Sequence, residues 1–163
     1  MPITSISKDT TALTLTVIAD YDVSVERLYQ AWSDPRQLEK FWGPETWPAT
    51  FTRHDMSVGG RSHYFMTGPQ GERTPNAYWE FLKIDEPSVI EVINGFALDD
   101  YSPDPASSPM RMTFNFNPTP SGSRFTGITH YASLEAMEEM LNMGMLEGMK
   151  SALGQMDAVL EST

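Results

Sequence analysis

The stretch SLEAMEEMLNMGMLEGMKSALGQMDAVLEST, residues 133–163, decides the fold of this chain. Its apolar residues recur at about 100° per residue, which predicts one long amphipathic helix that Ser133 caps. Gly144 and Gly148 lie at or beside the apolar stripe, although a glycine inside a helix costs about 1 kcal/mol relative to alanine. The stripe itself is formed by Leu134, Met137, Leu141, Met145, Met149, Ala152, Met156 and Val159.

Six of the eleven methionines lie in this stretch, and methionine fits irregular or changing shapes. Two interpretations follow. The helix either closes over a cavity, with its glycines giving space, or it packs against an ordinary core. Met140, Met143 and Leu146 fall off the apolar stripe. Because exposed apolar residues on one helix are typical of an interface, we also predict a homodimer.

The segments before this helix predict a sheet, because apolar and polar residues alternate along them. Two short helices follow the first strand, with Ser24 and Asp34 as N-caps and Gly43-Pro44 as the end of the second helix. Consecutive antiparallel strands covered by one terminal helix indicate an α+β fold, with a curved antiparallel sheet wrapped around the long C-terminal helix. The predicted strands are residues 12–19, 47–55, 61–67, 76–84, 89–97, 110–117 and 123–131.

Composition narrows the classes of function. At 163 residues, one domain spanning 1–163 is expected. The net charge of −11 argues against nucleic acid and against anionic membrane surfaces as partners. The sequence contains no run of about 18 apolar residues, so no membrane-spanning helix is predicted. The absence of cysteine excludes disulfides and thiolate metal sites and suits a reducing cytoplasm, which is the predicted location.

Four short motifs resemble those of a known superfamily. They are LEKFWGP at 38–44, DMSVGG at 55–60, GPQG at 68–71 and MGMLEGM at 143–149. Together they resemble the START-like, or SRPBCC, superfamily, and within it the bacterial domains similar to the C-terminal domain of the activator of heat-shock-protein-90 ATPase. The family often has arginine at the position of Ser57, so this chain departs from the pattern there. The resemblance implies a helix-grip fold with a cavity between the long helix and the concave face of the sheet.

The more apolar side of each strand is taken to face that cavity. Gly127 on the last strand is then a second position without a side chain, opposite the glycines of the helix, and the facing pair makes either a close contact or a hole. The lining is largely apolar with a few polar groups, as in small-molecule sites. The predicted ligand-binding residues are Phe51, Tyr64, Met66, Trp79, Phe81, Phe96, Met112, Phe114, Gly127, Thr129, Tyr131, Met137, Leu141, Met145 and Met149.

Few residues offer acid–base chemistry. Among the three histidines, alternation along the strands turns His63 and His130 outward and leaves His54 ambiguous, as a surface residue or a possible acid–base group. Glu138 lies near the inward stripe, where it is either a rim residue in water or a carboxylate with a raised pKa. No two histidines have helical i, i+4 spacing, so no metal site is predicted, and no cofactor is expected.

These observations favour a protein that holds a small apolar, lipid-like or aromatic molecule in a hydrophobic cavity. One alternative, implied by the resemblance, is an enzyme of the cyclase or dehydratase kind that acts on an aromatic or polyketide-like substrate. That enzyme would need a buried acid–base pair, for which His54, Glu138 and Tyr131 are the candidates. The other alternative is a stress-response or chaperone-associated domain that binds a protein partner.

Overall fold

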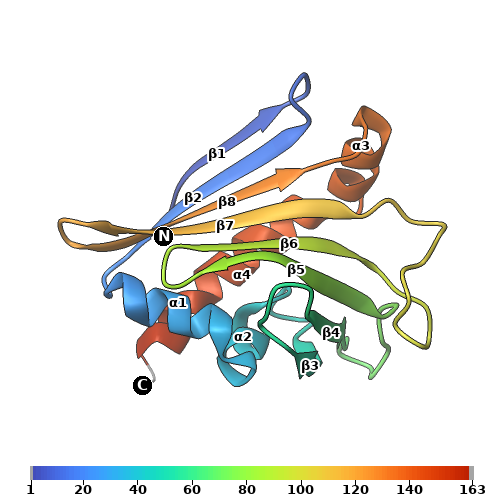
Figure 1. Ribbon diagram of the computed structural model, residues 1–163, viewed down its shortest axis with the longest axis horizontal. Helices are drawn as coiled ribbons and strands as arrows, with labels where there is room; N and C mark the ends of the chain where they lie inside the picture. Colours follow the sequence, from blue (N-terminus) through green and yellow to red (C-terminus); the bar gives the residue numbers. More distant parts are fainter. Residues whose placement is uncertain (1, 162–163) are drawn as a thin grey trace.

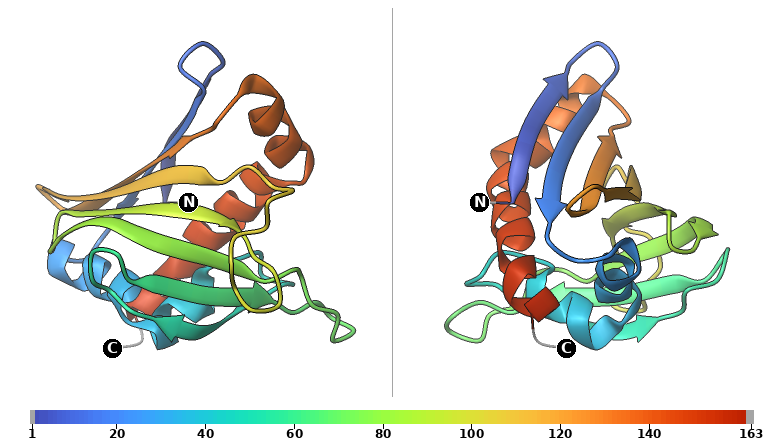
Figure 2. Two further views of the ribbon diagram at one scale, coloured as in Figure 1. Left: turned by 45° about the vertical axis from the view of Figure 1, so that its right-hand side comes forward. Right: turned by 90° about the vertical axis from the view of Figure 1, so that its left-hand side faces the viewer.

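Eight antiparallel strands form one sheet in the order β1-β2-β8-β7-β6-β5-β4-β3 in a computed structural model that describes residues 2–161. The sheet curves, and the last helix runs across its concave face (Figures 1 and 2). The α+β helix-grip fold is therefore confirmed. The strands are β1 (Ile3–Asp9), β2 (Thr14–Tyr21), β3 (Ala49–His54), β4 (Arg61–Met66), β5 (Ala77–Asp85), β6 (Val89–Phe96), β7 (Met110–Thr119) and β8 (Gly122–His130). The helices are α1 (Val25–Ser33), α2 (Pro35–Phe41), α3 (Leu134–Asn142) and α4 (Met145–Glu161).

The two short helices begin where the capping residues predict. The side chain of Ser24 accepts a hydrogen bond from the backbone N–H of Arg27 at 3.2 Å. The carboxylate of Asp34 accepts one from the backbone N–H of Arg36 at 2.9 Å, and Pro35 occupies the first turn of α2. These bonds satisfy N–H groups that have no partner inside the helix. The caps thus fix where α1 and α2 enter one end of the sheet.

One strand, β1, was missed by the sequence prediction. It pairs with β2 at the edge of the sheet, and a register shift lies between Ile3 and Ser5. Ile3 and Ile6 are partly buried, whereas the other residues of β1 are exposed. The bulge breaks the two-residue period on which strand prediction depends, so this edge strand has no clear alternation.

The C-terminal stretch is not one continuous helix. Gly144 has a φ of +90° and its N–H donates to the carbonyl of Leu141 at 3.1 Å. This left-handed conformation ends α3, and glycine adopts it without steric penalty. The long C-terminal helix is therefore α4 alone, and α3 is a separate short helix before it. The break also takes Leu134 off the predicted buried stripe, since its side chain is 44% exposed.

The core lies between α1, α4 and the sheet and is mainly aromatic. Trp32 of α1 is 1% exposed and stacks on Phe125 of β8, with ring centroids 4.9 Å apart. Its ring also lies 4.5 Å from that of Phe114 on β7. Trp32 thereby fills the concave face at the α1 end of the sheet.

Candidate functional site

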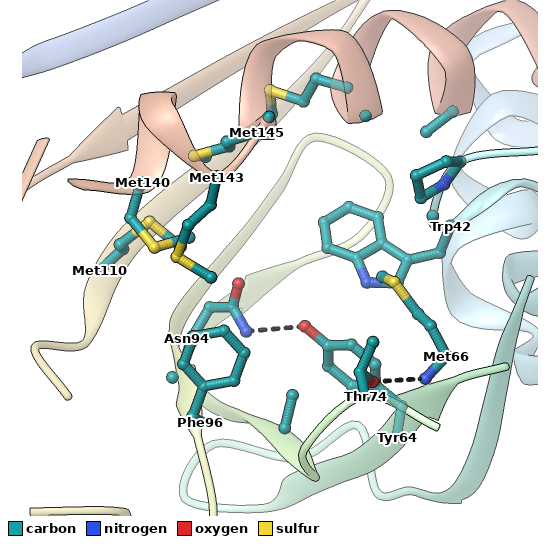
Figure 3. Close-up of a pocket in the computed structure, with 18 of the residues that line it drawn as sticks. Trp42, Tyr64, Met66, Thr74, Asn94, Phe96, Met110, Met140, Met143 and Met145 are labelled. Atoms are coloured by element: carbon teal, nitrogen blue, oxygen red, sulfur yellow. Dashed lines mark hydrogen bonds between the residues drawn. The ribbon is translucent and has the colours of Figure 1, made fainter. Parts of the chain in front are cut away.

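A pocket of about 420 Å³ lies at the other end of the concave face, beneath the break between α3 and α4. Its wall brings together segments that are far apart in the sequence: the turn after α2, strands β4 to β7 and the last two helices. Figure 3 shows the side chains converging on this space. The lining residues are Trp42, Gly43, Pro44, Tyr64, Met66, Thr74, Pro75, Ala77, Asn94, Gly95, Phe96, Ser108, Met110, Met112, Met140, Met143, Gly144, Met145, Gly148, Met149 and Ala152.

Methionine dominates this wall. The exposed fraction of these side chains changes with position, from 61% for Met143 on the α3–α4 turn to 2% for Met112 on β7. Methionine side chains are flexible and polarizable, so such a wall adapts to molecules of different shape. Seven of the eleven methionines contribute: Met66, Met110, Met112, Met140, Met143, Met145 and Met149.

Two polar side chains meet at the bottom of the pocket. The Asn94 amide donates to the Tyr64 hydroxyl at 2.9 Å and to the carbonyl of Tyr78 at 3.1 Å. Both residues are buried, Asn94 at 7% and Tyr64 at 5% exposed, and Figure 3 shows their bond as a dashed line. Burial raises the pKa of Tyr64, so its hydroxyl is a neutral group at physiological pH.

The pocket carries no formal charge. Within residues 2–161, none of its lining side chains is an acid, a lysine, an arginine or a histidine. Thr74 is already engaged, because its hydroxyl accepts a hydrogen bond from the backbone N–H of Met66 at 2.9 Å. The arrangement can therefore hold an uncharged molecule against an apolar wall, with polar groups at one end.

The structure divides the fifteen predicted ligand-binding residues into two groups. Six lie in the pocket wall: Tyr64, Met66, Phe96, Met112, Met145 and Met149. The other nine lie outside it, and most of them are core residues: Phe51, Trp79, Phe81, Phe114, Gly127, Thr129, Tyr131, Met137 and Leu141.

Several residues outside the pocket wall pack against the side chains that line it. The ring of Phe51 stacks on that of Tyr64 with centroids 4.8 Å apart, and the hydroxyl of Tyr131 lies 3.0 Å from the sulfur of Met145. Trp79 meets the ring of Trp42 edge-on at 5.0 Å. These residues hold wall side chains in place without lining the pocket themselves.

Gly127 does not face the helix glycines across a hole. A Cβ at this position would meet the ring of Phe125 at 2.9 Å, so that ring already occupies the space. Gly148 is different, because its Cβ would have only Pro44 nearby, at 3.7 Å, and Gly148 lines the pocket. The space left by glycine is therefore on α4 and not on β8.

Sequence reasoning missed two parts of the wall. Trp42, Gly43 and Pro44 lie in the turn after α2, which the family motif marks but which strand alternation does not cover. Met140 and Met143 were predicted to point away from the buried stripe. They line the pocket instead, because the chain changes direction at Gly144. The signal for this was the glycine itself, followed by a fresh run of helix-forming residues.

None of the three candidate acid–base groups, His54, Glu138 and Tyr131, is part of the pocket wall. His54 lies among core aromatics, with its ring 5.8 Å from Phe51 and its Nδ1 2.7 Å from the Ser62 hydroxyl. Burial lowers the pKa of His54, which is therefore neutral near pH 7. Glu138 is exposed on α3. The structure thus brings no acid–base pair to the pocket from these three residues.

Among residues 2–161, no helix is long and apolar enough to cross a membrane. In the same range, residues 2–161, histidine, aspartate and glutamate side chains form no group of three or more that could hold a metal ion.

Comparison with known proteins identifies the family. The chain belongs to the family described as activator of Hsp90 ATPase homolog 1-like protein, whose model matches residues 22–161. The resemblance drawn from residues 38–44 and 55–60 is thereby confirmed. No curated protein matches the chain.

Solved structures agree with this assignment. The chain is 42% identical to a protein from Mycobacterium smegmatis, with a TM-score of 0.89 and 99% of each chain covered. It is 41% identical to a protein from Arthrobacter aurescens, with a TM-score of 0.91, over 98% of this chain and 92% of that one. An AHSA1 protein from Silicibacter pomeroyi has a TM-score of 0.72 at 21% identity, over 91% of this chain and 97% of that one, and shares the fold.

Proposed function

We propose that the protein binds a small apolar or aromatic molecule in the pocket beneath the α3–α4 break. The observation that carries this proposal is the uncharged, methionine-rich wall, which surrounds about 420 Å³ beside a closely packed aromatic core. Aromatic rings fill one end of the sheet, whereas the other end retains open space. Pockets of about 300–1,000 Å³ with apolar walls and a few polar groups are typical of small-molecule sites.

Titration with N-phenyl-1-naphthylamine, a neutral dye whose fluorescence rises in apolar surroundings, tests this proposal. Saturable binding to one site per chain is expected. Gly148→Phe should weaken binding at least tenfold, because the new ring enters the pocket from a helical position that has open space around its Cβ.

Gly154→Phe is the matched control. It makes the same substitution on α4 at an exposed position with no atom within 4 Å of the added Cβ. The dye should bind this variant as it binds the unmodified protein. Equal binding to both variants, or no saturable binding to any of them, would show that the pocket does not hold apolar molecules.

Two predicted associations remain part of this proposal. A homodimer through the α3–α4 turn is expected from the exposed side chain of Met143, and sedimentation at increasing concentration measures it. A chaperone-associated role is favoured only by the name of the family. Stimulation of an Hsp90 ATPase by the purified protein would support that role, and Gly148→Phe would separate it from ligand binding.

We also expect a cytoplasmic location, from the absence of cysteine.

A further inference from the structure

The buried end of the pocket carries hydrogen-bonding capacity that the protein itself does not use. The indole Nε1 of Trp42 is buried and has no hydrogen-bond partner among the described residues. Trp42 as a whole is only 9% exposed and lines the pocket. The indole N–H groups of Trp32 and Trp79 in the packed core are unpartnered as well, but of these three tryptophans Trp42 is the one that lines the pocket, where the acceptor of a ligand can reach it.

Two further polar groups in the pocket also have hydrogen-bonding capacity that the protein does not use. Within residues 2–161, the Tyr64 hydroxyl accepts a hydrogen bond from Asn94 but donates none, and the Asn94 carbonyl oxygen accepts none. Figure 3 shows that oxygen turned away from Tyr64 and toward the methionines, into the pocket. The bottom of the pocket therefore offers two donors, from Trp42 and Tyr64, and one acceptor, from Asn94.

The N–H of Trp42 lies on the same side of the pocket as the Tyr64 hydroxyl. The indole N–H lies near enough to the Tyr64 hydroxyl to lower the pKa of Tyr64, against the larger effect of burial, although no hydrogen bond joins the two groups. In Figure 3 the indole nitrogen faces the region between Met66 and Tyr64. One ligand group could therefore reach these neighbours together.

The absence of charge in the wall decides the kind of group. A carboxylate placed there would lose its hydration without gaining a cation, because no charged side chain of the described residues lines the pocket. The net charge of −11 also disfavours an anion. An ammonium group would find no carboxylate. A hydroxyl fits, because it accepts from an N–H or O–H and donates to a carbonyl oxygen at the same time.

We propose that the ligand is a neutral molecule with an apolar body and one hydroxyl group, which binds between Trp42, Tyr64 and Asn94 while the body lies against the methionines. This inference rests on the proposed function, because it names the class of molecule that the pocket holds. It assigns the Tyr64–Asn94 pair and Trp42 to recognition and the rest of the wall to apolar contact.

Competition against N-phenyl-1-naphthylamine at pH 7 tests the inference with matched ligands. We expect 2-naphthol to bind at least fivefold more tightly than naphthalene, and 2-naphthoate to bind more weakly than either. The methyl ether of 2-naphthol should bind more weakly than 2-naphthol, because it cannot donate to the Asn94 oxygen. In a purely apolar pocket, 2-naphthol would bind more weakly than naphthalene and more weakly than its methyl ether, since burying an unpaired hydroxyl is unfavourable.

Variants locate the effect. Tyr64→Phe and Trp42→Phe should each reduce the preference for 2-naphthol over naphthalene, measured as the ratio of the two dissociation constants in the same variant. Tyr29→Phe is the matched control, because Tyr29 is a buried tyrosine that packs against Phe116 outside the pocket. Its preference should equal that of the unmodified protein. Thermal unfolding identifies any variant that does not fold, and the ligand series on the unmodified protein then decides.

The outcomes separate the two proposals. Saturable dye binding with naphthalene equal to or tighter than 2-naphthol would overturn the hydroxyl inference and leave apolar binding intact. A 2-naphthol preference that Tyr64→Phe and Trp42→Phe both retain would also overturn it. Failure of every probe, including the dye, would refute the proposed function itself.

Discussion

The two ends of the concave face are built from different side chains. At the α1 end, Trp32 is surrounded by rings, including Phe125 at 4.9 Å and Phe114 at 4.5 Å between centroids. At the α3–α4 end, methionines surround about 420 Å³ of space. Both ends share the same sheet and lie against the same C-terminal segment. The comparison shows that the face is filled where α1 places Trp32 against strand phenylalanines, and stays open where methionines line it.

The largest effect is expected at the aromatic end. Trp32→Ala should lower the free energy of unfolding by about 3–5 kcal/mol, because the rings around a side chain that is 1% exposed cannot collapse into the cavity it leaves. Urea unfolding measures the change. Met143→Ala at the pocket end, where the side chain is 61% exposed, should stay within about 0.5 kcal/mol of the unmodified protein. Similar losses in both variants would show that the two ends are equally packed.

A smaller effect distinguishes two glycines at the pocket end. Gly144→Ala should destabilise the protein by about 1–2 kcal/mol, because its φ of +90° brings an added Cβ close to the backbone. Gly148→Ala should instead stabilise it by about 0.5–1 kcal/mol, since the position is helical and the Cβ makes an ordinary 3.7 Å contact. Thermal unfolding compares the pair. A loss in both would mean that Gly148 is needed for more than space.

The weakest effect concerns pH and the aromatic end. Burial holds the pKa of His54 below its ordinary value of 6.5, so the unfolded chain binds more protons than the folded one below that value. The contribution of His54 to the free energy of unfolding is fully present above its ordinary pKa. That contribution is lost as the pH falls toward the lower pKa that His54 has in the folded protein. His54→Gln should therefore flatten the decline in unfolding free energy between about pH 7.5 and about pH 5.5. Parallel declines in both proteins would contradict this assignment.

Sequence alternation predicted which residues face inward but not how far along the sheet they lie. On β7, Met110, Met112, Phe114 and Phe116 share one face and are all buried. The two methionines line the pocket, and the two phenylalanines belong to the packed core. The period of two contains no information about this division, because it depends on where α1 and its tryptophan lie against the sheet.

Other parts of the prediction failed for local reasons. The helical period predicted continuous contact from Leu134 onward, but Gly144 redirects the chain and brings Met140 to the pocket. Strand β1 was not predicted, because its bulge disrupts the alternation of apolar and polar residues. The caps of α1 and α2 were predicted correctly, since a side chain that satisfies a nearby N–H depends only on neighbours in sequence.

The methionine wall has a chemical consequence beyond its shape. Oxidation turns a thioether into a sulfoxide, which is polar and chiral. The sulfur-bearing side chain of Met143 is 61% exposed, whereas those of Met137 and Met156 in the core are 1% and 0% exposed. Peroxide would therefore reach the pocket before the core. Each sulfoxide would place a polar oxygen in the wall, so the pocket would lose its apolar character while the fold stayed intact.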